Sequence, residues 1–292
     1  MSFSIVTDTS ANLPGELLRR YDLKVLPFSY NIGGEDRVDL EAQDFDAAGF
    51  FNAMRAGAKV ITSQIPPKTY FDCFEPLLAR GLDVLYVSMS SGISGSYASA
   101  CMAAKELEGR YSQRRIRCVD TGTASLGEGI QVLRAAELRE EGKTLEETVE
   151  ALVAESPHVC SIFTVDDLKY LRATGRLSGV ATVVGTVLGI KPILKGNEVG
   201  QIVLAGTVRG RRKVIEELAS RYDRLVTAPE TQQIGVAHAD CREDADYLIS
   251  LLRRNRPPRD ILLVDYEPVT GSHIGPSSLA LFFRGESDVR TK

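Results

Sequence analysis

Apolar runs of strand length alternate with segments of helical period from Phe3 to about Pro157. This alternation predicts βαβ crossovers and a mainly parallel sheet covered by helices on both faces. Four of the apolar runs end in clusters of hydroxyl side chains, at residues 7–10, 62–63, 88–96 and 121–123. In open parallel sheets the carboxyl ends of the strands form the ligand crevice, so we expect these clusters to converge on one oxygen-rich head group.

Helical periodicity predicts the segments between the strands. The expected helices span residues 11–21, 45–56, 66–80, 94–108, 124–141 and 144–154. Thr144 is a suitable cap for the last of them, because a threonine oxygen can accept from the free N–H groups of the first turn. After Pro157 the pattern changes, and we expect the chain to enter a second domain there.

The second half combines strands and helices in a less regular order. We expect strands at 160–165, 234–239 and 261–268, and helices at 166–172, 179–190, 211–222 and 243–254. Residues 191–194 and 201–208 are expected to pair around a turn at Gly196-Asn197. The predicted fold is therefore α/β with two domains, residues 1–158 with the mainly parallel sheet and residues 159–292 with a mixed sheet.

Composition excludes several classes of protein. A net charge of −4 over 292 residues argues against general nucleic-acid binding, which needs a basic surface. No apolar run approaches the roughly 20 residues of a membrane-spanning helix and no leader is visible, so we expect a cytoplasmic protein. The five cysteines are widely spaced and the three histidines lack metal-ligand spacing, so we expect neither disulfides nor a metal site.

Two short motifs resemble nucleotide-binding loops and fail on their spacing. Gly142-Lys143-Thr144 would need a glycine five positions before its Gly-Lys pair, where Glu137 stands. Residues 127–132 lack the third glycine of a dinucleotide fingerprint. We expect no nucleotide site.

The sharpest local signal is the sequence Ser-Gly-Ile-Ser-Gly-Ser-Tyr at residues 91–97. Its glycines permit a tight turn from strand to helix, and the N–H groups of the helix start suit a carboxylate or a phosphate. An ordinary capped helix explains the segment equally well. A nucleophile elbow is disfavoured, because it would need glycine where Ser96 stands.

Three further features admit two interpretations. His273 lies in a glycine-rich turn, 270–276, which we expect between a buried strand and an apolar helix, although a lone histidine is more often structural. Arginines flank the glycine turns near residues 175 and 210, where they are either solvated charge or contacts for an anion. The almost uncharged segment 179–190 is either core or a surface against which a hydrocarbon chain lies.

Seven motifs together resemble the DegV family of bacterial fatty-acid-binding proteins over nearly the whole chain. They are Asp8-Thr9-Ser10, Thr62-Ser63-Gln64, Ser91 to Tyr97, Phe163 to Leu168, Gly175-Arg176-Leu177-Ser178, Lys191-Pro192-Ile193-Leu194 and His273-Ile274-Gly275-Pro276. The resemblance implies a protein that holds one long-chain fatty acid between its two domains. It further implies the lipid-carrying subunit of a fatty-acid kinase, not itself an enzyme, whose partner kinase supplies ATP.

The resemblance also implies roles for particular residues. Thr62, Ser94 and His273 match the family residues that bind the carboxylate, and Arg176 and Arg209 match contacts for phosphate or the kinase. The supporting residues of the head-group loops are then Ser63, Gly92, Gly95, Ser96 and Gly275. Where the family has His-Thr-Gly-Pro-Gly, this chain has His-Ile-Gly-Pro-Ser at 273–277, and so lacks one hydroxyl and one glycine.

The fatty acid is expected to be the ligand, with no cofactor. Its acyl chain is expected to contact Val180, Val183, Val184, Val187 and Ile190. The segment 179–190 is also our candidate for the part that opens and touches a membrane surface transiently during exchange. Two alternatives stay open, a serine acyl hydrolase with Ser94 as nucleophile and His273 as base, and a sensor of small anions or sugar phosphates.

Overall fold

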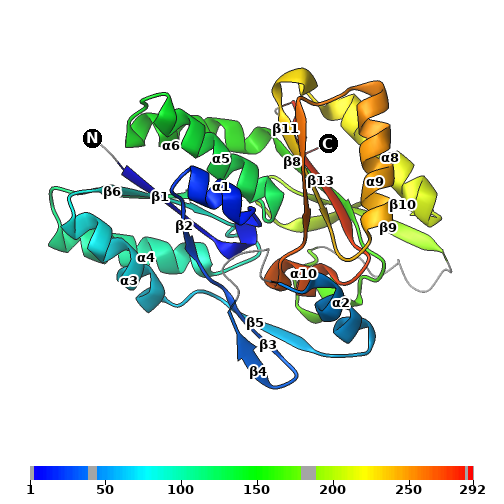
Figure 1. The fold of residues 1–292 in the computed structure, drawn as a ribbon, viewed down its shortest axis with the longest axis horizontal. Coiled ribbons are helices and arrows are strands. Elements are labelled where there is room, and N and C mark those ends of the chain that lie inside the picture. The colour runs from blue at the N-terminus through cyan, green and yellow to red at the C-terminus, as the bar shows by residue number, and fades with distance from the viewer. Residues whose placement is uncertain (1–2, 39–44, 179–188, 287–288, 292) are drawn as a thin grey trace. The chain divides into compact units, whose positions relative to one another are not determined.

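The structure is a computed structural model that describes residues 3–38, 45–178, 189–286 and 289–291. The chain divides into two compact units (Figure 1). The first comprises Met1–Phe45 and Val60–Ser156, and the second comprises Asp46–Lys59 and Pro157–Lys292. A short early segment of the chain therefore belongs to the second unit.

The first unit contains a four-stranded parallel sheet, as the alternation of strands and helices predicts. Its order is β2 (Lys24–Leu26), β1 (Phe3–Asp8), β6 (Asp83–Ser88) and β7 (Ile116–Asp120). Every residue of β1 and β6 is buried, which explains their nearly continuous apolar runs. The chain leaves β1 toward one edge and β6 toward the other, so the topological switch point lies between these two strands.

Helices cover both faces of this sheet. Figure 1 shows α3 (Pro67–Ala79) and α4 (Ser96–Arg110) on one face, and α5 (Leu126–Glu140) and α6 (Leu145–Glu155) on the other. The expected cap of α6 is confirmed, because the Thr144 and Glu147 side chains each accept from the other's backbone N–H.

The helix expected at 11–21 is wrong in its first part. The chain forms a single 3₁₀ turn, η1 (Thr9–Ala11), and then α1 (Gly15–Arg20). Asn12 takes a left-handed conformation with φ 56°, which ends the 3₁₀ turn. Pro14 then disfavours a helical conformation for Leu13.

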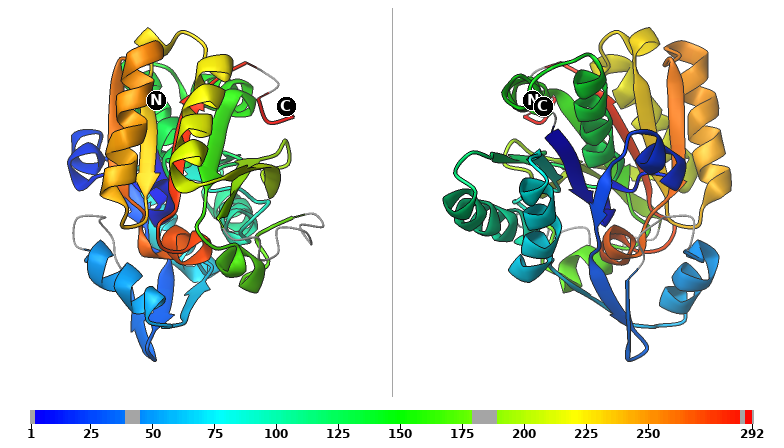
Figure 2. Two further views of the ribbon diagram at one scale, coloured as in Figure 1. Left: turned by 90° about the vertical axis from the view of Figure 1, so that its right-hand side faces the viewer. Right: turned by 60° about the vertical axis from the view of Figure 1, so that its left-hand side comes forward.

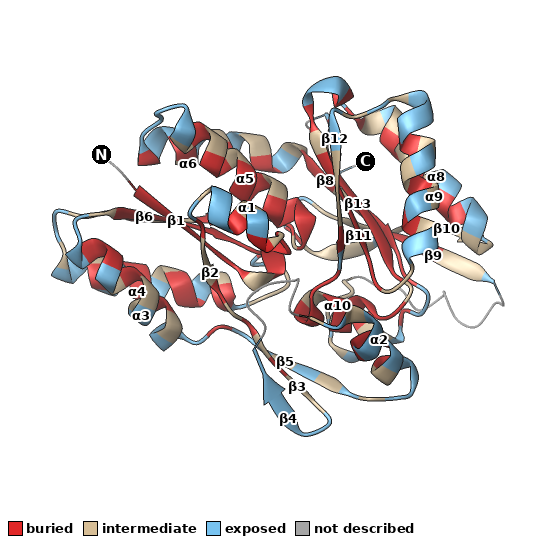
Figure 3. Ribbon diagram, in the orientation of Figure 1, coloured by how far each residue is buried: buried red, intermediate tan, exposed pale blue. Residues whose placement is uncertain are grey.

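The strand that carries Thr62 does not belong to the parallel sheet. β5 (Val60–Ser63) pairs antiparallel with β3 (Ser29–Ile32), which pairs in turn with β4 (Glu35–Arg37) in a separate three-stranded sheet. Half-buried and exposed residues alternate along β5. A strand of a parallel sheet covered on both faces would be buried throughout, as β1 and β6 are (Figure 3).

The second unit contains the expected mixed sheet. Its order is β10 (Ile202–Arg209), β9 (Ile190–Gly196), β8 (Val159–Thr164), β13 (Leu279–Arg284), β11 (Gln233–His238) and β12 (Asp260–Asp265). Among the pairings of these six described strands, only that of β11 with β12 is parallel. The hairpin around Gly196-Asn197 is confirmed, since β9 and β10 pair antiparallel. Gly196 pairs with Ile202 near the turn, and Ile190 pairs with Arg209 at the far end.

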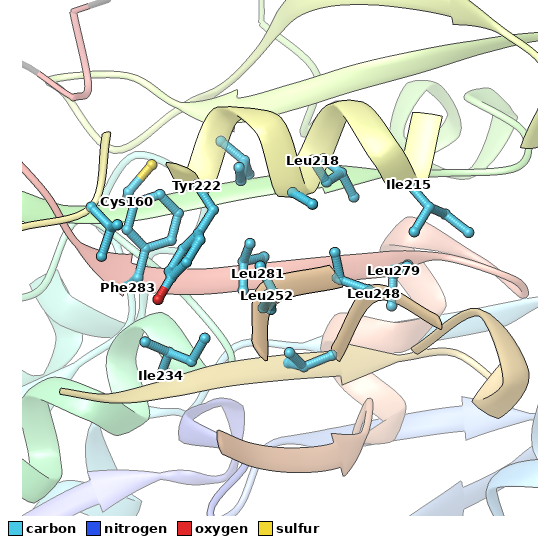
Figure 4. Close-up of a cluster of buried hydrophobic side chains, with 14 of the residues drawn as sticks. Cys160, Ile215, Leu218, Tyr222, Ile234, Leu248, Leu252, Leu279, Leu281 and Phe283 are labelled. Atoms are coloured by element: carbon cyan, nitrogen blue, oxygen red, sulfur yellow. The ribbon is translucent and has the colours of Figure 1, made fainter. Parts of the chain in front are cut away.

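Two amphipathic helices cover this sheet. α8 (Arg211–Leu225) and α9 (Arg242–Asn255) lie side by side over one face (Figure 1, Figure 2). Their apolar sides pack on the strands in a continuous core, in which the rings of Tyr222 and Phe283 meet edge to face at 5.1 Å between centroids (Figure 4). Burial of this core stabilises the unit.

The last part of the chain differs from the sequence prediction. Residues 279–284 form strand β13 and not a helix, and His273 lies in the last turn of a short helix, α10 (Pro268–Ile274). β13 lies between β8 and β11 and is almost wholly buried, so its apolar run does not alternate and cannot be told from a buried helix by period. α10 packs against α2 (Ala47–Arg55) and α7 (Lys169–Ala173).

Candidate head-group site

The loop between β6 and α4 lies at the switch point of the parallel sheet. Ser90 organises this loop, because its hydroxyl accepts from the Gly92 N–H at 3.0 Å and its carbonyl accepts from the Ser94 N–H at 3.1 Å. The Ser90 N–H donates to the carbonyl of Thr123 at 2.7 Å. The hydroxyl clusters that follow β6 and β7 are therefore neighbours, as the sequence predicts.

Ser96 joins this loop to the segment that follows Thr62. Its hydroxyl oxygen accepts from the Ile65 N–H at 3.2 Å and from the Ser94 hydroxyl at 3.1 Å. Gly95 also lies against this segment, since a Cβ there would come within 2.3 Å of Gln64 Oε1. Within the first unit, the structure thus brings the Thr62 segment and Ser94 together even though β5 belongs to another sheet.

The hydroxyl cluster after β1 has a different role from the one expected. Asp8 and Ser10 are fully buried, and the Ser10 hydroxyl lies between the carboxylates of Asp8 and Glu128. Burial raises the pKa of Asp8 above its ordinary value. The Thr9 hydroxyl accepts from the Phe28 N–H at 3.1 Å. The Asp8, Ser10 and Glu128 side chains thus bond one another in the interior of the first unit.

His273 belongs to the second unit, where α10 presents it. The two oxygens of Glu267 accept from the N–H groups of Val269 and Thr270 at 2.6 Å each and so fix the start of α10. His273 is mostly buried, and burial, with a smaller effect of the nearby Arg176 charge, lowers its pKa to about 4. The imidazole is neutral near pH 7, so one ring nitrogen donates and the other accepts.

Arg176 and Arg209 lie near opposite ends of strand β10. Leu177, which follows Arg176, bridges to Ile202 at the start of β10, and Arg209 is the last residue of that strand. Ile202 and Arg209 are seven residue steps apart, which corresponds to roughly 23 Å along the strand. Arg176 is half-buried and acts on His273, whereas Arg209 is exposed.

Most of the predicted acyl-chain contacts lie outside the residues that the structure describes. Val180, Val183, Val184 and Val187 lie outside the described residues. Ile190 is half-buried and opens β9, where it pairs with Arg209. Within the described part of the chain, no three His, Cys, Asp or Glu side chains form a group that could hold a metal ion. Nor does any described helix have the length and apolar character needed to cross a bilayer.

Comparison with known proteins supplies the family. The model of a family described as "Uncharacterised protein, DegV family" matches residues 2–286. The chain belongs to the DegV family. A DegV domain-containing protein of Clostridium perfringens is 34% identical over 285 residues, which is 98% of each chain. A second, from Lactococcus lactis, is 31% identical over 283 residues and covers 97% of each chain. The resemblance noted from the sequence motifs is confirmed.

Solved DegV structures share the whole fold. A DegV family protein from Thermus thermophilus is similar with a TM-score of 0.89 and 29% identity, over 98% of this chain and 100% of the other. DegV from Bacillus subtilis is similar with a TM-score of 0.85 and 26% identity, over 98% and 100% of the two chains. Both are described as fatty-acid-binding proteins. The predicted α/β fold is confirmed by structures that match 98% of the chain.

Proposed function

We propose that this protein binds one long-chain fatty acid and presents the carboxyl group to a partner kinase that forms acyl phosphate from ATP. The observation that carries the proposal is the Ser94 loop, a set of joined hydroxyl groups at the switch point of a parallel sheet. Membership of a family whose solved members bind fatty acids supports the choice of ligand.

In this proposal three side chains bind the carboxylate. Thr62 and Ser94 donate hydroxyl hydrogens, and the neutral His273 donates its ring N–H. A neutral imidazole suits this task because it keeps one ring N–H, which can donate to the carboxylate. Arg176, whose charge lowers the pKa of His273, adds a positive charge near the imidazole.

The acyl tail and the carboxylate contribute differently to the free energy of binding. Burying a CH₂ group contributes about 0.8 kcal/mol, so about 15 methylenes give a gross term on the order of 12 kcal/mol before the costs of binding. Each hydrogen bond to a carboxylate contributes only about 1.5 to 3 kcal/mol. The tail therefore provides most of the affinity, and the polar side chains fix where the carboxylate points.

We further propose where the protein works and which partner it meets. It works in the cytoplasm, touches a membrane surface only transiently while it exchanges its ligand, and meets the kinase through a surface that includes the exposed Arg209. A serine hydrolase is a weaker reading, because the Ser94 hydroxyl donates to Ser96 and not to a general base.

Mass spectrometry and titration test the proposal. A solvent extract of the purified protein should contain free long-chain fatty acid, and an empty extract from folded protein that also fails to bind added fatty acid would refute it. Ser94→Ala should weaken fatty-acid binding by roughly tenfold, the effect of one hydrogen bond to a charged group. Ser91→Ala, which removes an exposed hydroxyl from the same loop, is the matched control and should bind as the wild type does.

A further inference from the structure

α2 belongs to the second unit and packs there against α10, the helix that carries His273 (Figure 1). The ring of Phe51 in α2 is fully buried, and a Cβ added at Gly271 of α10 would come within 2.8 Å of its Cζ. Gly271 lies inside the helix and has no positive φ, so it is the Phe51 ring that leaves space for glycine alone. The two helices are therefore in direct contact two residues before His273.

A second contact holds the C-terminal end of α2. Arg55 donates from Nη1 to Asp240 Oδ2 at 2.5 Å and from Nη2 to the Asp240 carbonyl at 3.3 Å. Asp240 has φ 53°, a left-handed conformation that aspartate tolerates better than most residues. Its neighbour Ala239 donates to the Ser278 carbonyl at 2.9 Å and accepts from the Ser277 N–H at 2.7 Å. Arg55 is thus bound to a loop that is itself joined to the chain just after α10.

The chain that follows α2 has almost no slack before β5 begins. The Gly57 N–H donates to the Met54 carbonyl at 3.0 Å, and the Ala58 N–H donates to the Ala53 carbonyl at 2.9 Å. With Gly57 at φ 97°, these two bonds form a Schellman motif, which fixes the residues after the helix. Only Lys59 separates this motif from β5. A displacement of α2 is therefore passed to β5 through the backbone.

We propose that Arg55 and Phe51 are positioning residues, which fix α2 beside α10 and through α2 fix the strand that presents Thr62. The inference rests on the proposed function, in which Thr62 and His273 bind the same carboxylate. Neither positioning residue contacts the ligand in this proposal. They preorganise the Thr62 hydroxyl, whose strand lies outside the parallel sheet, so that its place does not have to be fixed when the ligand binds.

Removal of the Arg55 contact should cancel the contribution of Thr62 and spare that of Ser94. In calorimetric titration with oleate, Arg55→Ala should bind roughly tenfold more weakly than the wild type, the effect of one hydrogen bond to a charged group. Thr62→Val should weaken the wild type by the same factor and add nothing in the Arg55→Ala background. Ser94→Ala should weaken binding roughly tenfold in both backgrounds.

This pattern separates positioning from a general loss of stability, which would not single out Thr62. Wild-type affinity in Arg55→Ala overturns the proposal, and so does a full tenfold effect of Thr62→Val in that background. Arg117→Ala is the matched control and should bind oleate as the wild type does. The Arg117 side chain is 33% exposed, against 36% for Arg55, and it lies 2.7 Å from Glu146 in an ion pair of the first unit.

The Phe51 contact can be tested with a wedge. Gly271→Ala places a methyl group against the Phe51 ring and should displace α2 from α10, with the same loss of the Thr62 effect. Phe51→Leu in the same chain makes room for that methyl group, so the double variant should regain most of the affinity. Wild-type binding in Gly271→Ala, or a double variant that binds no more tightly than Gly271→Ala alone, contradicts the role of Phe51.

Hydrogen exchange tests the coupling without any ligand. The β5 amides should exchange faster in Arg55→Ala than in the wild type, because the strand has lost its anchor, and they should not change in Arg117→Ala. Unchanged exchange in Arg55→Ala refutes the positioning role. A wild-type protein that binds no fatty acid refutes the proposed function instead, and the exchange rates of β5 then still decide whether Arg55 fixes this strand.

Discussion

Gly275 lies directly against the ring of Tyr170, where a Cβ would come within 2.2 Å of Cδ2. Its φ of 82° is also a conformation that favours glycine. Gly275→Ala should therefore lower the free energy of unfolding by about 2 to 4 kcal/mol, from backbone strain and from displacement of the ring. Urea denaturation monitored by circular dichroism measures this.

Gly57 is the matched control for the ring contact. Its φ of 97° is similar, but a Cβ there would meet no atom within 4 Å. Gly57→Ala should lower the free energy of unfolding by about 1 to 2 kcal/mol, from backbone strain alone. Equal losses in the two variants would show that Tyr170 moves aside without cost.

His273 should make the protein sensitive to acid. Its pKa of about 4 in the fold lies below the ordinary 6.5, so the unfolded chain binds the proton more tightly and stability is lost as pH falls from about 6.5 toward 4. Between about pH 7 and about pH 5 this one group should account for about 2 kcal/mol of that loss. His273→Gln should lose less stability over the same interval, and a loss as large as that of the wild type would contradict the assignment.

The two arginines should separate binding from transfer. Arg209→Ala should leave fatty-acid affinity unchanged but lower the phosphorylation of bound fatty acid by the partner kinase, roughly tenfold for one lost ionic contact. Arg176→Ala should raise the pKa of His273, because it removes a positive charge beside the imidazole. Titration of ligand, kinase assays with radiolabelled ATP and NMR of the imidazole measure these three quantities. Loss of fatty-acid binding in Arg209→Ala would reverse the proposed roles.

Thr144 should contribute to stability independently of function. Its hydroxyl accepts from the Glu147 N–H at 3.2 Å and the Glu147 carboxylate accepts from the Thr144 N–H at 2.8 Å. Thr144→Ala should lower the free energy of unfolding by about 1 kcal/mol, while Thr144→Ser should keep nearly all of it. A serine variant as unstable as the alanine variant would show that the methyl group and not the cap is responsible.

The sequence alone was enough to predict those helices and strands whose spacing of apolar residues matches the way they are buried. β1, β6 and the helices that follow β6 and β7 could be predicted because a strand buried on both faces and an amphipathic helix differ in pattern. β13 could not, since a short run that is apolar at every position fits either structure. The separate sheet of β5 could not be predicted either, because pairing with β3 depends on partners distant in sequence.

The candidate site was predictable to the same degree. Ser94 follows a strong strand and stands among glycines, so its place at the switch point could be inferred. Glu128 lies inside α5, where a single polar residue gives no sign that it shares the Ser10 hydroxyl with Asp8. The only hint was that Asp8-Thr9-Ser10 is polar directly after a fully buried strand.

The position of β13 has a consequence for biosynthesis. Because this strand lies between β8 and β11, the sheet of the second unit consists of two disconnected halves until residue 284 has left the ribosome. α2, made much earlier, also has to wait for α10, against which it packs. All residues of the first unit precede Pro157, so its whole sequence is available for folding while the remainder is still being translated.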